Sequence, residues 1–158
     1  MGWLLRKSIG LATITAYIRS HTDEDGKLHI DIDNNLTGGV KGTTEHRTID
    51  GNIRVHEDYI FGTVHGHSVL ASVGTIKDEK AEIEAHLKNG WLPECEAEGS
   101  LIYTLAENRK NGWTARQVWG FQDVGGKRMY ARNVAVSKGD QIAKAKFYYD
   151  YLGPIDQK

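Results

Sequence analysis

The chain has 158 residues, close to one domain of roughly 150 residues, so we expect residues 1–158 to form a single domain with its own core. Hydrophobic residues make up 39% and charged residues 26%, and the formal net charge is −1, as in an ordinary globular protein. This charge, without a basic run, argues against a nucleic-acid partner, and no apolar run is long enough to span a membrane.

Short segments of period-two alternation, separated by turn residues, predict strands along nearly the whole chain. Asp25-Gly26, Asp50-Gly51 and Asn111-Gly112 are strong hairpin-turn signals. In chain order, strands are expected at residues 13–21, 27–36, 40–49, 53–59, 60–71, 100–108, 113–123, 127–137 and 141–152. The fourth and fifth of these are either two strands or one long bent strand.

Residues 78–88 are the only segment that predicts a convincing helix, because Glu, Ala, Lys and Leu favour helices and Asn89-Gly90 supplies the end. Residues 3–10 predict a short helical turn or the end of a strand. Eight or nine antiparallel strands at this spacing predict an all-β fold, either a barrel or a sandwich. An up-and-down β-barrel of this size can hold one small ligand in its interior.

The last three predicted strands favour the barrel, because one face of each mixes large aromatic side chains with Gln and Arg. A plain sandwich core would carry mainly Val, Ile and Leu at these positions. We interpret the mixed faces as a wall around a small hydrophobic or aromatic molecule. They hold Trp113, Ala115, Gln117, Trp119 and Phe121 in the first strand, Arg128, Tyr130, Arg132, Val134 and Val136 in the second, and Ala145, Phe147, Tyr149 and Tyr151 in the third.

Glu45 and Arg47 are two residues apart, so they share one face of a predicted strand and are expected to form a charge pair. If that face lines the barrel, the pair is partly desolvated and can orient or polarise a ligand. If the face is exterior, the pair is an ordinary surface salt bridge worth under about 1 kcal/mol. Alternation leaves both alternatives open.

Histidines gather at His46, His56, His65 and His67, but none of the usual zinc-binding spacings is present, so we expect no metal site. A general acid or base role is a hypothesis for His56, against the plainer alternative of a surface or hydrogen-bonded interior histidine. Phosphate-binding and nucleophile-elbow motifs are also missing, which argues against a nucleotide cofactor or covalent catalysis. We therefore expect no cofactor.

Cys95 is the single cysteine, so no internal disulfide can form, and its acidic neighbours predict a spare surface thiol. The apolar stretch near the N-terminus lacks the small-residue cleavage site of a signal peptide. Both observations favour a reducing, cytoplasmic location.

Several segments, spread over nearly the whole chain, resemble small fungal lipocalin-like (calycin-type) β-barrel proteins associated with secondary metabolism. The most specific is the Gln-Val-Trp-Gly-Phe element. The matching segments are residues 29–33, 37–39 and 42–50, His56-x-Asp58-x-x-Phe61-Gly62, residues 113–121, Arg128-x-Tyr130-x-Arg132 and Tyr149-x-Tyr151-x-Gly153.

This resemblance implies a cup that binds an apolar or aromatic metabolite. Some barrels of this kind act as cofactor-free cyclases or isomerases, and the fungal hetero-Diels–Alderases, which join a tropolone quinone methide to a sesquiterpene, are a relevant set. The sequence departs from the pattern by lacking one strand ahead of residues 2–7. Such a gap would leave an unpaired sheet edge and favour a homodimer.

The first hypothesis is a cofactor-free cyclase or isomerase, of Diels–Alder type with dehydration, acting on a polyketide- or terpenoid-like metabolite. Its expected catalytic residues are Glu45 and His56, which would move a proton, and Arg132, which would stabilise developing negative charge. Ligand-binding residues are expected to provide further hydrogen bonds and a stacking wall. They are Arg47, His65, Gln117, Trp119, Tyr130 and Tyr149.

Two other functions remain alternatives. A non-catalytic carrier would use the same residues to hold a small hydrophobic ligand unchanged. A structural or interaction module would have a filled interior and a sizeable apolar surface patch. Polar groups interleaved with aromatics favour the enzyme, because a passive apolar carrier needs fewer buried charges.

Overall fold

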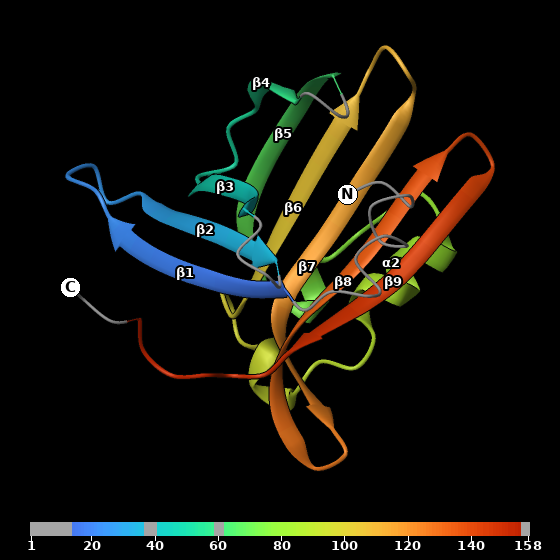
Figure 1. Cartoon of the computed structure of the whole chain (residues 1–158). Helices are drawn as coiled ribbons and strands as arrows, with labels where there is room; N and C mark the ends of the chain where they lie inside the picture. Colours follow the sequence, from blue (N-terminus) through green and yellow to red (C-terminus); the bar gives the residue numbers. More distant parts are fainter. Residues whose placement is uncertain (1–13, 37–40, 59–61, 156–158) are drawn as a thin grey trace. The chain divides into compact units, whose positions relative to one another are not determined.

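The computed structural model describes residues 14–36, 41–58 and 62–155, which hold nine strands and one α-helix (Figure 1). The predicted all-β class, with eight to nine strands and one short helix, is therefore confirmed. The chain divides into two compact units, residues 1–48 with 155–158, and residues 49–154. We call them unit 1 and unit 2. The single-domain assignment stays a prediction, and the element expected at residues 3–10 lies outside the described residues.

Unit 1 is built on β1 (Ile14–Thr22), β2 (Leu28–Leu36) and β3 (Lys41–Ile49). β1 and β2 pair antiparallel along their full length, from Ile14 with Leu36 to Thr22 with Leu28. Asp23 closes their predicted hairpin, since its Oδ1 accepts hydrogen bonds from the backbone N–H of Asp25 and of Lys27. Gly26 has φ +79°, the left-handed conformation that this turn requires.

The two faces of unit 1 differ in chemistry. One carries the buried Ile30 and Ile32. The other carries imidazole–carboxylate pairs: His29 Nε2 lies 2.6 Å from Asp23 Oδ2, and His46 Nδ1 lies 2.7 Å from Asp31 Oδ1. The hydrogen bond from His46 is the main reason that the pKa of Asp31 lies below its ordinary value, and His29 has the same effect on Asp23.

Unit 2 is an up-and-down antiparallel sheet in which β4, β5, β6, β7, β8 and β9 pair in that order. Three short helical elements connect β5 to β6. The strands are β4 (Arg54–Asp58), β5 (Gly62–Ala71), β6 (Leu101–Asn108), β7 (Trp113–Val124), β8 (Lys127–Lys138) and β9 (Gln141–Tyr149). The helical elements are the 3₁₀ turn η1 (Val73–Thr75), the helix α2 (Ala81–Lys88) and the 3₁₀ turn η2 (Pro93–Glu96).

One predicted turn does not make a hairpin. Asp50-Gly51 was expected to join two paired strands, but β4 pairs with β5, and Ile49 at the end of β3 pairs in parallel with Ser68 of β5. The backbone N–H of Gly51 also donates to the carbonyl of Ser68. The chain therefore bends at this point to continue beside β5, a long-range pairing that local turn chemistry does not specify.

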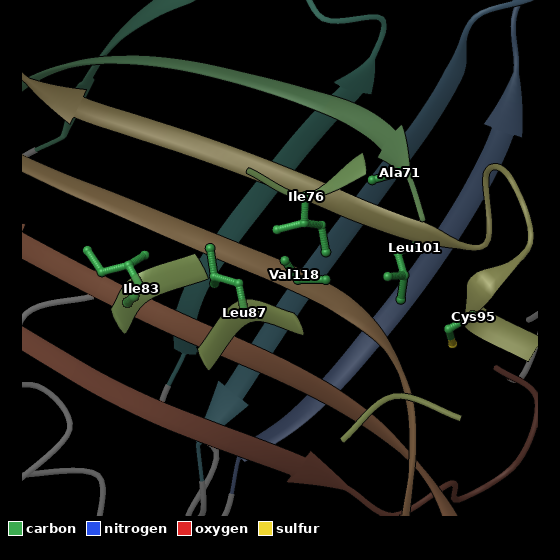
Figure 2. Packing of buried hydrophobic residues seen from close by; sticks show 8 residues of the cluster. Ala71, Ile76, Ile83, Leu87, Cys95, Leu101 and Val118 are labelled. Carbon is green, nitrogen blue, oxygen red and sulfur yellow. The ribbon is translucent and has the colours of Figure 1, made fainter. Parts of the chain in front are cut away.

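Helix α2 lies against β8 and covers one face of the unit 2 sheet (Figure 1). Its Ile83 and Leu87 are fully buried in a cluster with Val118 and Ala135 (Figure 2). Cys95 belongs to the same cluster and is 1% exposed, so the prediction of a surface thiol is wrong. The η2 turn brings this cysteine against the end of the sheet, where its Sγ lies 3.8 Å from the carbonyl of Phe121.

A buried asparagine holds the end of α2 on the sheet. The side chain of Asn133 is fully buried, and its Nδ2 donates to the carbonyl oxygens of His86 at 3.0 Å and Asn89 at 2.9 Å. Its Oδ1 accepts from Gln122 Nε2 at 2.8 Å. Carbonyl groups at a helix C-terminus lack intrahelical partners, so this side chain satisfies groups that would otherwise be buried without one.

We predict that Asn133→Ala lowers the free energy of unfolding by about 2–4 kcal/mol, because several buried polar groups lose their partner at once. Urea unfolding followed by circular dichroism measures the change. Asn35→Ala, at an exposed position of β2, is the matched control and should stay within about 0.5 kcal/mol of wild type. A loss for Asn133→Ala no larger than that of the control would contradict this role.

We also predict that the carboxyl pKa of Asp31 rises toward its ordinary value in His46→Ala, as measured by carbon-detected NMR titration. Asp23, which keeps its own partner His29, is the internal control and should keep its lowered pKa. Because both native pKa values are lowered, the stability that these pairs contribute is present above the unfolded-state pKa and is lost as pH falls through the native pKa. An unchanged Asp31 pKa in the variant argues against the pair.

Candidate functional site

The strand registers bring the three aromatic-rich faces onto one surface of unit 2. Trp119 of β7 pairs with Arg132 of β8, which pairs with Phe147 of β9. In the next row, Phe121 pairs with Tyr130 and Tyr130 with Tyr149. Asn133 and Val118, which contact α2, alternate with these residues, so the aromatic side chains lie on the sheet face opposite the helix. We call this surface the aromatic face, made of Gln117, Trp119, Phe121, Tyr130, Arg132, Phe147 and Tyr149.

The centre of the aromatic face is a guanidinium stacked on an indole. Arg132 and Trp119 are each 3% exposed, and the Arg132 Cζ lies 4.1 Å from the centroid of the Trp119 ring. Arg132 Nε donates to the hydroxyl of Tyr130 at 2.9 Å, and Nη1 donates to Gln117 Oε1 at 3.4 Å. These contacts fix the plane of the guanidinium, so its hydrogen-bond donors point in set directions.

Aromatic rings extend this centre toward the end of the sheet. The Phe121 and Tyr130 ring centroids lie 6.2 Å apart in an edge arrangement, and those of Tyr130 and Tyr149 lie 5.2 Å apart. Arg128 lies 3.7 Å above the Phe121 ring. Tyr151, expected to continue the wall, lies beyond the end of β9 and is 83% exposed, so the wall ends at Tyr149.

A row of polar residues adjoins the centre, and two of them were not expected from the sequence. Ser68 of β5 pairs with Thr104 of β6, which pairs with Gln117 of β7. Ser68 is 3% and Thr104 is 4% exposed. Their strands were predicted, but only the register shows that these hydroxyl groups share a face with Gln117. The aromatic face thus offers hydrogen-bond donors and flat π surfaces side by side.

The predicted pair of Glu45 and Arg47 forms in unit 1, with Oε1 and Nη2 3.1 Å apart and both side chains about one-fifth exposed. Asn34 Nδ2 donates to Glu45 Oε2 at 3.2 Å. Asn34 and the buried Ile32 share a face of β2 by alternation, so the pair lies on the apolar side of the unit 1 sheet. It is therefore a partly buried pair rather than an exposed surface salt bridge.

The structure does not bring the two predicted histidines to Arg132. His56 is exposed and pairs with Val64 of β5. The row of cross-strand partners that contains Arg132 reaches β5 at Leu70, six residues along the strand from Val64. That separation is about 20 Å along the strand. His65 pairs with Val55 and Glu107, which places it on the helix-bearing face.

Two cavities are lined by residues other than those of the aromatic face. The larger, of about 370 Å³, is in unit 1 and is lined among others by Tyr17, Arg19 and Asp33. The smaller, of about 250 Å³, is in unit 2 and is lined among others by His67 and Tyr103. The aromatic face is therefore distinguished by its buried Arg132 and the rings around it.

No three His, Cys, Asp or Glu side chains among residues 14–36, 41–58 and 62–155 are placed to hold a metal ion. In the same part of the chain, no helix is both long and apolar enough to cross a membrane.

Comparison with known proteins finds two similar chains. The sequence is 26% identical to the pericyclase pydY of Acremonium sp over 155 residues, which are 98% of this chain and 80% of that protein. It is also 26% identical to the probable pericyclase scpY of Mollisia scopiformis over 157 residues, 99% of this chain and 79% of that protein. No protein-family model and no solved structure matches the chain. The chain is thus similar to pericyclases, whereas its predicted membership of the lipocalin-like proteins remains a prediction.

We predict that Arg132 and Trp119 are energetically coupled. In a double-mutant cycle of Arg132→Met and Trp119→Leu, urea unfolding should give a coupling free energy of about 1–2 kcal/mol, because the cation–π contact is desolvated. A parallel cycle of Arg109→Met with Trp119→Leu is the control and should be additive within about 0.5 kcal/mol, since Arg109 lies in the distant turn after β6. Additivity in both cycles would show that the stack contributes nothing.

Proposed function

We propose that this protein is a cofactor-free pericyclase, a cyclase or isomerase of the Diels–Alder type, which acts on a hydrophobic polyketide- or terpenoid-like metabolite held at the aromatic face. The observation that carries the proposal is the buried Arg132 guanidinium, stacked on Trp119 and oriented by Tyr130 and Gln117. The similarity to two proteins named as pericyclases, over nearly the whole chain, supports the same class of reaction.

A pericyclic reaction suits such a surface because it needs no group from the protein to enter the product. In a Diels–Alder reaction, π bonds are exchanged for σ bonds between atoms that the substrate already contains. The protein must hold the diene and its partner in a reactive geometry, and this restriction of freedom can supply several kcal/mol of the barrier. The rings of Trp119, Tyr130 and Tyr149 would provide flat surfaces for that purpose.

Arg132 would act on the electron-poor partner. A guanidinium N–H that donates to a carbonyl or phenolate oxygen stabilises the negative charge that develops there, which lowers the barrier. Tyr130 and Gln117 would position the guanidinium, and the hydroxyls of Ser68 and Thr104 lie in the adjoining row. Burial strengthens these interactions because the local dielectric constant is low.

A dehydration that forms the reactive partner would also need proton transfer. The sequence predicts Glu45 and His56 for this step, in which a base takes a proton from the substrate while an acid protonates the departing hydroxyl. We keep them for a step separate from cyclisation at the aromatic face, because His56 lies about 20 Å along β5 from the row of Arg132. Both oxygens of Glu45 already accept hydrogen bonds, from Arg47 and Asn34, so a positioning role for this carboxylate is the alternative. The variants that test these two groups are Glu45→Gln and His56→Gln.

We predict that the purified full-length protein, incubated with a small-molecule extract of its source organism, converts at least one compound into an isomer or a dehydrated, cyclised product. Liquid chromatography with mass spectrometry follows the reaction. Arg132→Met should slow it by about 10²-fold or more, the usual effect of removing one donor that stabilises developing charge. Arg109→Met, which removes an exposed arginine, should react at the wild-type rate.

The same experiment separates the alternatives. A compound that is bound and recovered unchanged would show a carrier and contradict catalysis. Conversion by Arg132→Met at the wild-type rate, with the fold intact by circular dichroism, would contradict the role of the aromatic face. If nothing binds and native mass spectrometry shows a dimer, the result contradicts an enzyme and supports a structural or interaction module.

A further inference from the structure

The smaller cavity of unit 2 is a separate site with its own chemistry. It lies where η1 and the residues after it pass over β5 and β6, and we call it the η1 pocket. It has a volume of about 250 Å³. Val69 and Tyr103 are cross-strand partners on the helix-bearing face, so this pocket is on the side of the sheet opposite the aromatic face. Its lining includes His67, Val69, Ala71, Ile76, Lys77 and Tyr103.

One wall of the η1 pocket is apolar. Ala71 is 8% and Ile76 is 2% exposed, and both belong to the buried cluster that contains Ile83 and Leu87 (Figure 2). Val69 adds a β-branched side chain from near the end of β5. This wall would contact an apolar ligand body rather than solvated groups.

Three hydrogen-bond donors also line the pocket. His67 lies on β5, Lys77 follows η1 and Tyr103 lies on β6. Within the described part of the chain, none of these three side chains makes a hydrogen bond or ion pair to another side chain or to the backbone. Thr75, the other polar side chain of the lining, already bonds the backbone of Ser72. Three donors beside an apolar wall, with no carboxylate in the lining, are suited to an anionic group.

A buried ion pair holds the segment that follows η1 against β7. Arg116 Nε lies 2.5 Å from Asp78 Oδ2, and the two side chains are 12% and 5% exposed. Asp78 Oδ1 also accepts from the backbone N–H of Lys80, so the segment that carries Lys77 is held against β7. Burial is the main reason that the pKa of Tyr103 is raised, which keeps its phenol a neutral hydrogen-bond donor.

We propose that the η1 pocket binds a small organic anion with an apolar body, of the class of aromatic or short-chain monocarboxylates. The carboxylate would be held by Lys77, the Tyr103 hydroxyl and His67, and the body would lie on Val69, Ala71 and Ile76. The volume is below the range of roughly 300–1,000 Å³ that is usual for drug-sized ligands, so the occupant has about one ring or a short chain. This site is independent of the function proposed for the aromatic face.

Benzoate is the probe for the test, with full-length ¹⁵N-labelled protein and two-dimensional NMR titration. We expect saturable shifts of the backbone amides near residues 67–77 and 103. Benzamide, which has the same shape without the charge, should bind at least about tenfold more weakly, as expected for loss of a charge-assisted contact. Lys77→Gln and Tyr103→Phe should each weaken benzoate binding by about three- to tenfold.

Both variants suit the purpose, because Lys77 is exposed and Tyr103→Phe removes only a hydroxyl group. Lys110→Gln, in the exposed turn before β7, is the control and should bind benzoate as wild type does. The proposal is overturned if benzoate does not saturate, if benzamide binds equally well, or if the shifts occur only at the aromatic face. Unchanged affinity in both Lys77→Gln and Tyr103→Phe would overturn it as well.

Discussion

The stack of the Arg132 guanidinium on the Trp119 indole is the interaction on which the candidate site depends. A guanidinium is always charged, and burying a charge is costly unless it is hydrogen-bonded and packed. Here the ring of Trp119, the hydroxyl of Tyr130 and the amide of Gln117 supply that environment. The consequence is a cation that is already oriented before any ligand arrives, which is what stabilisation of a developing charge requires.

Because side chains alternate along a strand, neighbouring residues lie on opposite faces of the sheet and have different structural roles. Arg132 belongs to the aromatic face, whereas Asn133, the next residue, holds the end of α2 on the other face. On β7, Trp119 stacks with Arg132, whereas Gly120 faces Leu101 and Trp91, where a Cβ atom would clash with the Leu101 side chain. A slip of one residue in the register of β8 would move each of its side chains to the opposite face of the sheet. The same register therefore determines both the packing of the helix and the geometry of the site.

The local elements could be predicted from the sequence, because period-two alternation and glycine turns are local signals. They located the strands and the helix to within a few residues, although they left β4 and β5 open as two strands or one long bent strand. They also grouped Trp119 with Gln117 and Arg132 with Tyr130. What they could not supply is long-range pairing. The contact of Ile49 with Ser68, the polar row of Ser68 and Thr104, and the placement of His65 on the helix-bearing face all depend on registers between distant segments. Cys95 was misplaced for the same reason, since its burial comes from a turn folding onto the sheet.

Whether the aromatic face holds the ligand can be observed at its own side chains while the natural ligand binds. Two-dimensional ¹⁵N NMR resolves the indole Nε1–H of Trp119 and the Nε–H of Arg132, once assigned with Trp119→Phe and Arg132→Lys. If the aromatic face holds the ligand, both resonances shift and saturate together with the compound that the protein consumes or binds. If that compound shifts only resonances of unit 1 or of the helix-bearing face, the ligand binds elsewhere and the aromatic face is not the site.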